Sequence, residues 1–209
     1  MTDLQNLVHT IALTLGVGWA SGINLYAAIA MLGIAGAGGY VHLPDTLAVV
    51  QDPLVIAAAA FMYCVEFFAD KTPGVDTAWD ALHTFIRIPA GALLAAGAVG
   101  DVNPAVSITA GLLGGTLSAA SHATKAGARV LINTSPEPFS NWFASIVEDV
   151  SVFAGLWTAL NHPVVFLLLL AAFLALVIWL LPKLWRGVRA LGRRIVAFFR
   201  RAPEHAGAP

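Results

Sequence analysis

Residues 163–181 form a continuous apolar run that contains no charged side chain. Its length matches the roughly 20 residues that an α-helix needs to cross the hydrocarbon core of a bilayer. The rest of the chain is also poor in charge, because only 11% of its 209 residues are Asp, Glu, Lys or Arg. Soluble domains carry about 25%. The sequence therefore predicts an integral membrane protein and excludes both a cytosolic globular enzyme and a disordered chain.

Five further apolar stretches cover residues 4–38, 53–70, 88–100, 104–130 and 138–160. The first is too long for one span and contains Gly18, Ser21, Gly22 and Asn24, so we expect two helices joined at a break near 18–22. The stretch 88–100 is too short to cross a membrane alone. Three helices are expected to begin at Pro53, Pro104 and Pro163, since proline fits the first helical turn and each follows a polar residue.

The predicted fold is thus all-α, a polytopic membrane bundle with broken and short helices. It divides into one helical domain, residues 1–182, and a basic tail, residues 183–209. Segments 18–24 and 115–121 share a spacing of small and polar residues, which suits an inverted repeat of the kind found in transporters. The matching residues are common ones, so the repeat remains an alternative.

The tail contains seven of the eleven basic residues and, with Glu204, has a net charge of +6. Basic residues that follow a membrane helix stay in the cytoplasm, so the C-terminus is predicted to be cytoplasmic. Apolar residues repeat at helical spacing between these arginines, from Leu184 onwards. This pattern predicts an amphipathic helix that lies on the anionic lipids of the inner leaflet.

Polar and charged residues before position 182 follow helical stripes. The spacing 0, 4, 7, 11 occurs at Asp76, Asp80, His83 and Arg87, and again at Ser118, His122, Lys125 and Arg129. Asn141, Ser145 and Glu148 repeat the first three steps, and Glu66 and Asp70 lie one turn apart. At 3.6 residues per turn, each stripe occupies one helix face.

Ionisable side chains cannot face lipid cheaply, since each costs about 2.5–3.5 kcal/mol at the centre of the membrane. We therefore predict one polar interior, with Glu66, Asp70, Asp76, Asp80 and Glu148 near Lys71, Arg87, Lys125 and Arg129. Asp149 lies about 100° around the helix from Glu148, so it needs a different partner.

Three interpretations of this interior remain open. It is a set of structural ion pairs, a path for an ion, proton or solute, or a membrane-embedded catalytic or metal site. No cofactor is predicted. For the third interpretation, Glu66, Asp70, Asp76 and Asp80 with His83 offer mainly oxygen ligands, which suit a divalent cation such as magnesium, manganese or calcium.

Known catalytic motifs are absent from the sequence. It contains no Gly-x-Ser-x-Gly, His-Glu-x-x-His or phosphate-binding glycine loop. The single cysteine, Cys64, lies in an apolar segment where a thiolate is disfavoured. Nothing in the chain is typical of nucleic-acid binding.

Three segments together resemble a known family. They are residues 20–27, residues 66–80 with the sequence Glu-Phe-Phe-Ala-Asp-Lys at their start, and residues 135–141. The family consists of bacterial multi-pass membrane proteins whose domain has no known function, number four-one-two-six of its series. The resemblance covers roughly residues 5–180. It implies a location in the bacterial inner membrane and brings no activity, substrate or site residue.

The leading hypothesis is a small channel or transporter for an ion or small polar solute, with proton coupling as one form of it. The acidic residues would bind a cation or proton, and His122, Lys125 and Arg129 would balance charge. One alternative is a metal-dependent enzyme acting on lipid head groups, and another is a non-catalytic assembly or scaffold subunit. The expected partners are the lipid bilayer and a second copy of the chain, since a homodimer would provide room for a pathway.

Overall fold

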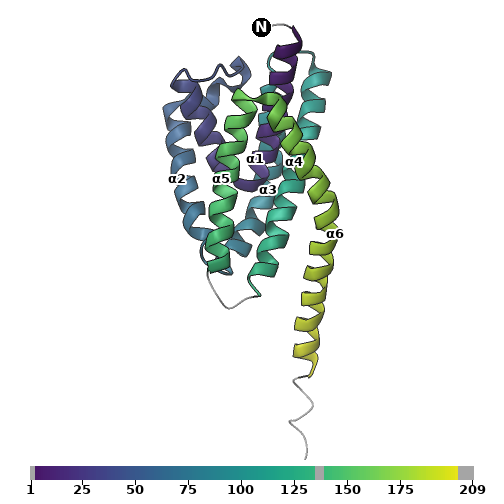
Figure 1. Ribbon diagram of the computed structural model, residues 1–209. Helices are drawn as coiled ribbons and strands as arrows, with labels where there is room; N and C mark the ends of the chain where they lie inside the picture. Colours follow the sequence, from purple (N-terminus) through teal and green to yellow (C-terminus); the bar gives the residue numbers. More distant parts are fainter. Residues whose placement is uncertain (1–2, 135–138, 202–209) are drawn as a thin grey trace, which may run out of the picture.

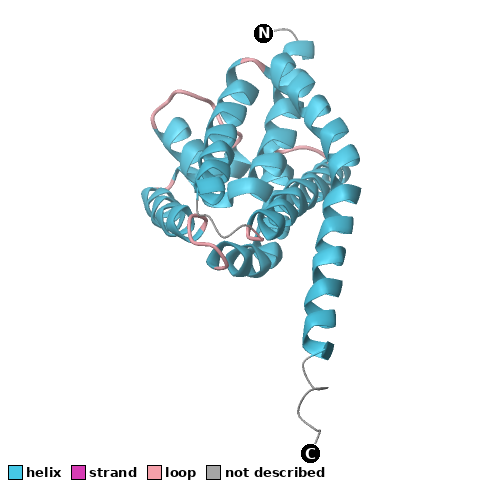
Figure 2. Ribbon diagram, turned by 60° about the horizontal axis from the view of Figure 1, so that its bottom comes forward, coloured by secondary structure: helices cyan, strands magenta, loops and turns pink. Residues whose placement is uncertain are grey.

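The computed structural model describes residues 3–134 and 139–201, and every regular element in these ranges is a helix (Figure 2). The elements are α1 (Asp3–Ala37), the short 3-10 helix η1 (Asp45–Gln51), α2 (Pro53–Ala69), α3 (Val75–Ala98), α4 (Pro104–Ile132), α5 (Phe139–Asn161) and α6 (Pro163–Arg201). Among the described residues, α1, α3, α5 and α6 are long and apolar enough to cross a membrane, and η1 with α2 forms a bent pair that makes a fifth candidate. The prediction of an all-α membrane bundle is confirmed. Residues 135–138, which belong to the segment that resembles the known family, and the last tail residues, 202–209, lie outside the described residues.

Local side-chain chemistry sets the predicted helix starts. α2, α4 and α6 begin at Pro53, Pro104 and Pro163, as predicted. The Asp52 carboxylate accepts a hydrogen bond from the Leu54 amide at 2.8 Å, and the Asn103 side chain does the same for Ala105 at 2.8 Å. Each side chain satisfies an amide that the first helical turn leaves unpaired.

The short apolar stretch 88–100 and the polar stripe that precedes it form one helix, α3. Its 24 residues are about 36 Å long, so together the two segments are long enough to cross a membrane. The helix therefore spans the bundle with a charged first half and an apolar second half. The basic tail joins α6 in a similar way, because that helix continues across residue 182 to Arg201. The division at residue 182 stays a prediction from charge alone.

The expected break in α1 is present and lies at Asn24, where φ is −146° and ψ is 96°; this is the last of the four residues expected to mark it and two residues beyond the expected centre at 18–22. Gly18, Ser21 and Gly22 are helical; the two glycines pack against α4, and Ser21 lies beside Gly91 of α3. A Cβ atom on Gly18 would lie 2.7 Å from the Gly114 Cα, and one on Gly22 would overlap the Ser118 carbonyl oxygen. These glycines allow two backbones to approach closely, which is the usual role of small residues in membrane helices.

The two arms of α1, residues 3–23 and 25–37, both reach the upper end of the bundle as drawn in Figure 1. Leu7 and Ile11 line a cavity with Val106 near the start of α4. In the second arm, Gly33 and Gly36 lie against residues 50–51 of η1. Because these neighbours belong to the same end, α1 enters the bundle, turns at Asn24 and returns. The broken helix is therefore re-entrant.

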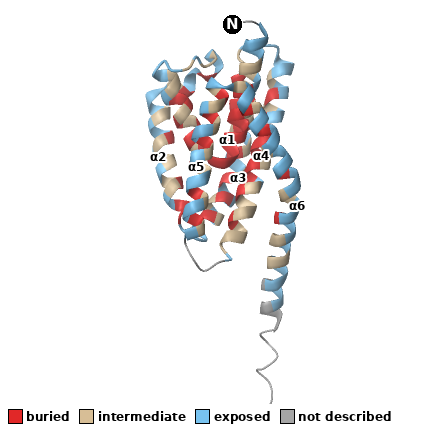
Figure 3. Cartoon of the chain, viewed as in Figure 1, coloured by how far each residue is buried: buried red, intermediate tan, exposed pale blue. Residues whose placement is uncertain are grey.

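α1 forms the centre of the core (Figure 3). It contacts every other helix, and its residues from Ala12 to Gly33 are mostly buried. The outer faces of the surrounding helices expose large apolar side chains such as Leu82, Phe85 and Phe143. In water such a surface would be unstable, whereas in a bilayer it faces lipid.

Candidate functional site

The polar stripes of α3, α4 and α5 face one another, together with the end of α2. We call seven of their side chains the charged cluster: Glu66, Asp70, Asp80, Arg87, Lys125, Arg129 and Glu148. Six of these side chains are at most 2% exposed, and Glu148 is 17% exposed. The cluster lies toward the lower end of the bundle in Figure 1, where α2 ends and α3 begins. The structure thus brings together residues that are up to 82 positions apart in the sequence.

Arg87 links α3 to α2. Its Nη2 lies 2.6 Å from Glu66 Oε1, and its Nη1 lies 3.0 Å from Asp80 Oδ1. Asp80 is seven residues earlier on the same helix, so Arg87 reaches both its own stripe and the neighbouring helix. The arginine and both acids are at most 1% exposed. Charge-assisted bonds at these distances are the strong class of hydrogen bond.

Lys125 is the hub of the cluster. Five oxygen atoms from four other segments surround its ammonium. They are Asp70 Oδ2 at 2.7 Å, the Ile23 carbonyl at 3.1 Å, Glu66 Oε1 at 3.4 Å, Glu148 Oε2 at 3.6 Å and Asp80 Oδ1 at 3.7 Å. A single positive charge is therefore shared by four carboxylates and one backbone carbonyl.

Arg129 closes the cluster toward the lower end. Its Nη2 and Nε bind the two oxygens of Glu148 at 2.6 and 3.2 Å, which is the bidentate geometry of a strong pair. Its Nη1 donates to the Asp70 carbonyl at 2.8 Å and to the Asn141 carbonyl at 3.1 Å. The arginine therefore joins α4 to α5 and to the end of α2.

Three carboxylate oxygens of the cluster accept no hydrogen bond from the described residues. Glu66 Oε2, Asp70 Oδ1 and Asp80 Oδ2 are buried without a hydrogen-bond partner among the described residues. Four carboxylates face three basic groups in the cluster, which leaves one negative charge when all are ionised. An unsatisfied buried acceptor costs about 1–3 kcal/mol, and more when charged. These oxygens are therefore places where a proton or a cation would be stabilised.

The broken helix meets the cluster. Lys125 donates to the carbonyl of Ile23, at the end of the first arm, where the helix dipole is negative. Asn24 follows, and its side-chain oxygen accepts from the Ala27 amide at 2.9 Å, which caps the second arm. The Asn24 amide nitrogen donates to Asp149 Oδ1 at 3.1 Å, so the predicted separate partner of Asp149 is Asn24. Opposite charges thus stand at the two half-helix ends.

Replacing Asn24 with alanine should lower the free energy of unfolding by about 1–2 kcal/mol, because the cap is lost and the buried Asp149 carboxylate loses a donor. Denaturant titration of the purified protein in detergent measures the change. Asn24→Asp keeps an oxygen cap but places a second carboxylate beside Asp149. Its free energy of unfolding should therefore be lowered by at least as much as that of Asn24→Ala. A variant as stable as wild type would contradict this role for Asn24.

Two predicted members lie outside the ion pairs. Asp76 accepts from the amides of Gly74 and Thr77 and from the Asn133 side chain, at 2.6–2.9 Å, so its hydrogen-bond partners are neutral. Arg129 is the predicted basic residue that lies within electrostatic range of its carboxylate. Lys71, in the turn after α2, donates to Ser145 Oγ and lies over the Phe67 ring. Burial lowers the pKa of the Lys71 ammonium from its usual value.

The two histidines of the stripes have defined neighbours. His83 stacks on Trp79 with 4.1 Å between ring centroids and contacts Tyr26 Oη at 3.1 Å. His122 lies 2.7 Å from Thr84 Oγ1 and 3.2 Å from Arg87 Nη1, next to the cluster. Both rings form polar contacts between helices.

Sequence reasoning missed Asn133, which connects Asp76 to Asn141. It donates to both Asp76 oxygens and accepts from the Asn141 side chain at 2.6 Å. The signal was present, since Asn133 follows Arg129 by four residues and continues the stripe of α4 by one more turn. The stripe ended at Arg129 in our interpretation because Arg129 is the last charged residue of that segment.

With Lys125 and the arginines in place, the described acids do not assemble a metal site. Within residues 3–134 and 139–201, no group of three or more His, Cys, Asp or Glu side chains has a geometry that could hold a metal ion. The acids that could have converged on a metal, Glu66, Asp70 and Asp80, are instead paired with Arg87 and Lys125. This arrangement gives the metal-dependent enzyme hypothesis no support.

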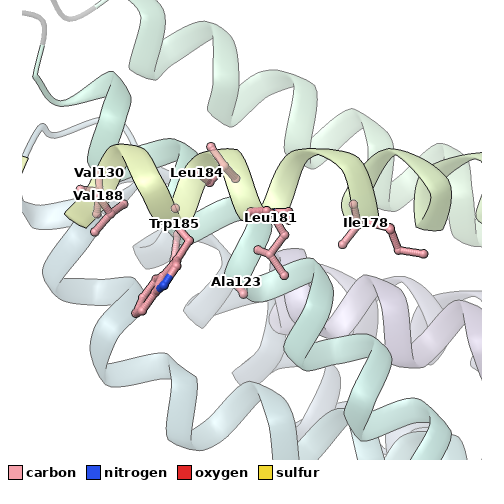
Figure 4. A pocket seen from close by; sticks show the side chains of 11 residues that line it. Ala123, Val130, Ile178, Leu181, Leu184, Trp185 and Val188 are labelled. Atoms are coloured by element: carbon pink, nitrogen blue, oxygen red, sulfur yellow. The ribbon is translucent and has the colours of Figure 1, made fainter. Parts of the chain in front are cut away.

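A separate apolar groove lies on the outside of the bundle between α4 and α6 (Figure 4). Its volume is about 760 Å³, and Ala123, Leu181 and Trp185 are among the residues that line it. Next to it, the basic side chains Lys183 and Arg189 lie over tryptophan rings of α6. None of its lining residues belongs to the charged cluster and all are apolar, so it has the character of a lipid-facing surface.

In the comparison with known protein families, a family model matches residues 11–183. The matched range includes the break in α1 and every member of the charged cluster, and it ends where the basic tail begins. Comparisons with curated proteins and with solved structures found no match. Because this family model covers most of the chain, the protein belongs to the family described as a domain of unknown function, DUF4126.

Proposed function

We propose that this protein transports a proton or another small cation across the membrane, with the charged cluster as the point through which the ion passes. One observation carries the proposal. The re-entrant helix α1 breaks against a buried cluster in which three carboxylate oxygens have no partner among the described residues.

Broken helices are typical of transport sites. At such a break, carbonyls and half-helix ends become available to an ion at membrane depth. In this protein the Ile23 carbonyl and the cap at Asn24 meet Lys125 and Asp149, so the break and the charges form one unit. The cluster side chains other than Glu148 are at most 2% exposed. A sealed cluster favours a transporter that opens to each side in turn over a continuously open channel.

Energetics also support a functional role. Burying seven charges costs several kcal/mol per ion, which pairing offsets only in part, and apolar residues of similar size would stabilise a bundle as well or better. Ionisable groups inside a membrane protein therefore indicate function by default. A second candidate is a scaffold subunit, which the well-formed pairs of Arg87 and Arg129 favour.

The proposed location is the bacterial inner membrane, with the C-terminus in the cytoplasm. The chain enters at the upper end in Figure 1, and α6 leaves the bundle at the lower end with Arg186, Arg189, Arg193 and Arg194. Basic residues at one end of a membrane helix favour the cytoplasmic side. In this orientation the charged cluster lies closer to the cytoplasm.

Flux into proteoliposomes tests the proposal. Glu66→Gln removes one buried charge at nearly constant volume and should reduce proton or cation flux at least tenfold relative to wild type, measured under pH gradients and a panel of cations. Asp52→Asn is the matched control, because it makes the same chemical change at a helix cap where asparagine serves equally well. Equal, background-level flux in wild type and Glu66→Gln would rule out transport of the ions tested. Lower abundance of the variant together with such background flux would support the scaffold.

A further inference from the structure

We propose that the Lys125 ammonium occupies a binding site for a monovalent cation of similar size, such as potassium or ammonium, and that the transported cation competes with Lys125 for this site. The proposal rests on the proposed function in that it names the substrate class of the same cluster.

The surroundings of Lys125 Nζ are those of a cation site. An ordinary ion pair joins a lysine to one carboxylate, whereas this ammonium lies within 3.7 Å of oxygens from Glu66, Asp70, Asp80 and Glu148 and from the Ile23 carbonyl. The ammonium has only three protons to donate. Asp70 Oδ2 and the Ile23 carbonyl lie within 3.1 Å of it, and the other three oxygens also accept from Arg87 or Arg129. A spherical cation is not limited to three directed bonds and can draw on oxygens that the arginines already share.

The unpartnered oxygens are a second, independent observation. Glu66 Oε2, Asp70 Oδ1 and Asp80 Oδ2 belong to residues that are 0–2% exposed, and none has a hydrogen-bond partner among the described residues. Each shares a carboxylate with an oxygen that contacts Lys125. The free oxygens therefore lie beside the occupied ones, and the site offers more acceptors than its present occupant uses.

Charge and size select the cation. Lys125 carries one positive charge, so a monovalent ion replaces it without changing the balance of the buried cluster, whereas a divalent ion would add a charge. Asp70 Oδ2 and the Ile23 carbonyl lie 2.7 and 3.1 Å from the ammonium nitrogen. Potassium and ammonium have similar radii and suit this spacing, while sodium and lithium are smaller. A backbone carbonyl among the ligands is a feature of sites that replace the hydration shell of such ions.

Lys125→Ala removes the tethered ammonium from Asp70 Oδ2 and the Ile23 carbonyl, while the oxygens of Glu66, Asp80 and Glu148 keep their arginines. The melting temperature of this variant in detergent should rise with potassium, rubidium or ammonium concentration in a saturable way, by at least 5 °C over the same concentration of N-methylglucamine. Sodium and lithium should give less than half of that increase. Wild-type protein should show no more than a small change, because Lys125 already fills the site.

Two matched variants control for general salt effects and for folding. Lys71→Ala also removes a buried lysine, but its ammonium contacts Ser145 Oγ and the Phe67 carbonyl rather than a set of carboxylates, so no cation should stabilise it. Lys125→Met keeps the volume of the lysine stem and should require potassium during purification to remain monodisperse.

The outcomes separate this proposal from the proposed function. Cation-specific stabilisation of Lys125→Ala without flux through wild type would keep the site and overturn transport. Flux through wild type with no cation-specific stabilisation of either Lys125 variant would keep transport and overturn the site. Failure of both variants to fold even at high potassium concentration would also overturn it, because a cation of the right size would refill the vacated position.

Discussion

Replacing Arg87 with methionine should lower the free energy of unfolding by about 3–5 kcal/mol, the typical effect of removing one partner from a buried ion pair. Arg87 is fully buried and is within 3.0 Å of oxygens of both Glu66 and Asp80. Without the guanidinium, these carboxylates retain only the more distant Lys125 ammonium, at 3.4 and 3.7 Å. Unfolding by denaturing detergent, followed through the fluorescence of the six tryptophans, measures the loss.

Two further variants make the Arg87 result specific. Arg186→Met removes an exposed arginine that donates to the Pro182 carbonyl of its own helix, and it should change stability by less than about 0.5 kcal/mol. Glu66→Gln combined with Arg87→Met should be more stable than Arg87→Met alone, because one of the stranded charges is gone. Equal losses in the single and double variants would show that Arg87 contributes through packing rather than through its charge.

Most of the fold was predictable because its signals are local. The starts at Pro53, Pro104 and Pro163 each depend on one proline and the polar residue before it, which act within a single turn. The break in α1 was expected, with Asn24 among its residues, but it was centred too early because a glycine can mark either a break or a close helix contact. Gly18 and Gly22 serve close packing on α4, a contact with residues nearly 100 positions away. Asn24 breaks the helix because its own side chain can cap the next arm.

That the polar stripes face one another was predictable from the free-energy cost of exposing charged side chains to lipid. Charged residues on several membrane helices avoid this cost mainly by facing one another. Which pairs form was not predictable, because pairing depends on helix rotation and depth. Asp76 illustrates this limit. The stripe of α3 faces the polar interior, but Asp76 lies at the very start of that helix. There its carboxylate accepts hydrogen bonds from backbone amides and from Asn133 rather than from a basic side chain.

The close crossing of α1 and α4 holds the break in place, and one added methyl group should test it. Gly22→Ala should lower the free energy of unfolding by about 3 kcal/mol, at the upper end of the cost of overpacking. The new Cβ would overlap the Ser118 carbonyl and Ser121 Oγ, and neither can move freely. Ser121 Oγ is tied to the Trp19 carbonyl at 2.9 Å, and Ser118 belongs to the backbone of α4.

The sign of the effect makes this test decisive. Alanine is a better helix former than glycine by about 1 kcal/mol, so a helical glycine with free space around it should gain stability from the same change. Gly192 is such a position, because a Cβ atom there meets nothing within 4 Å, and Gly192→Ala should be neutral or slightly stabilising. Denaturation of both variants under the same conditions isolates the packing cost from the helix propensity. If Gly22→Ala also gained stability, the two backbones could not lie as close as the structure places them, and the contact between the broken helix and Lys125 would lose its support.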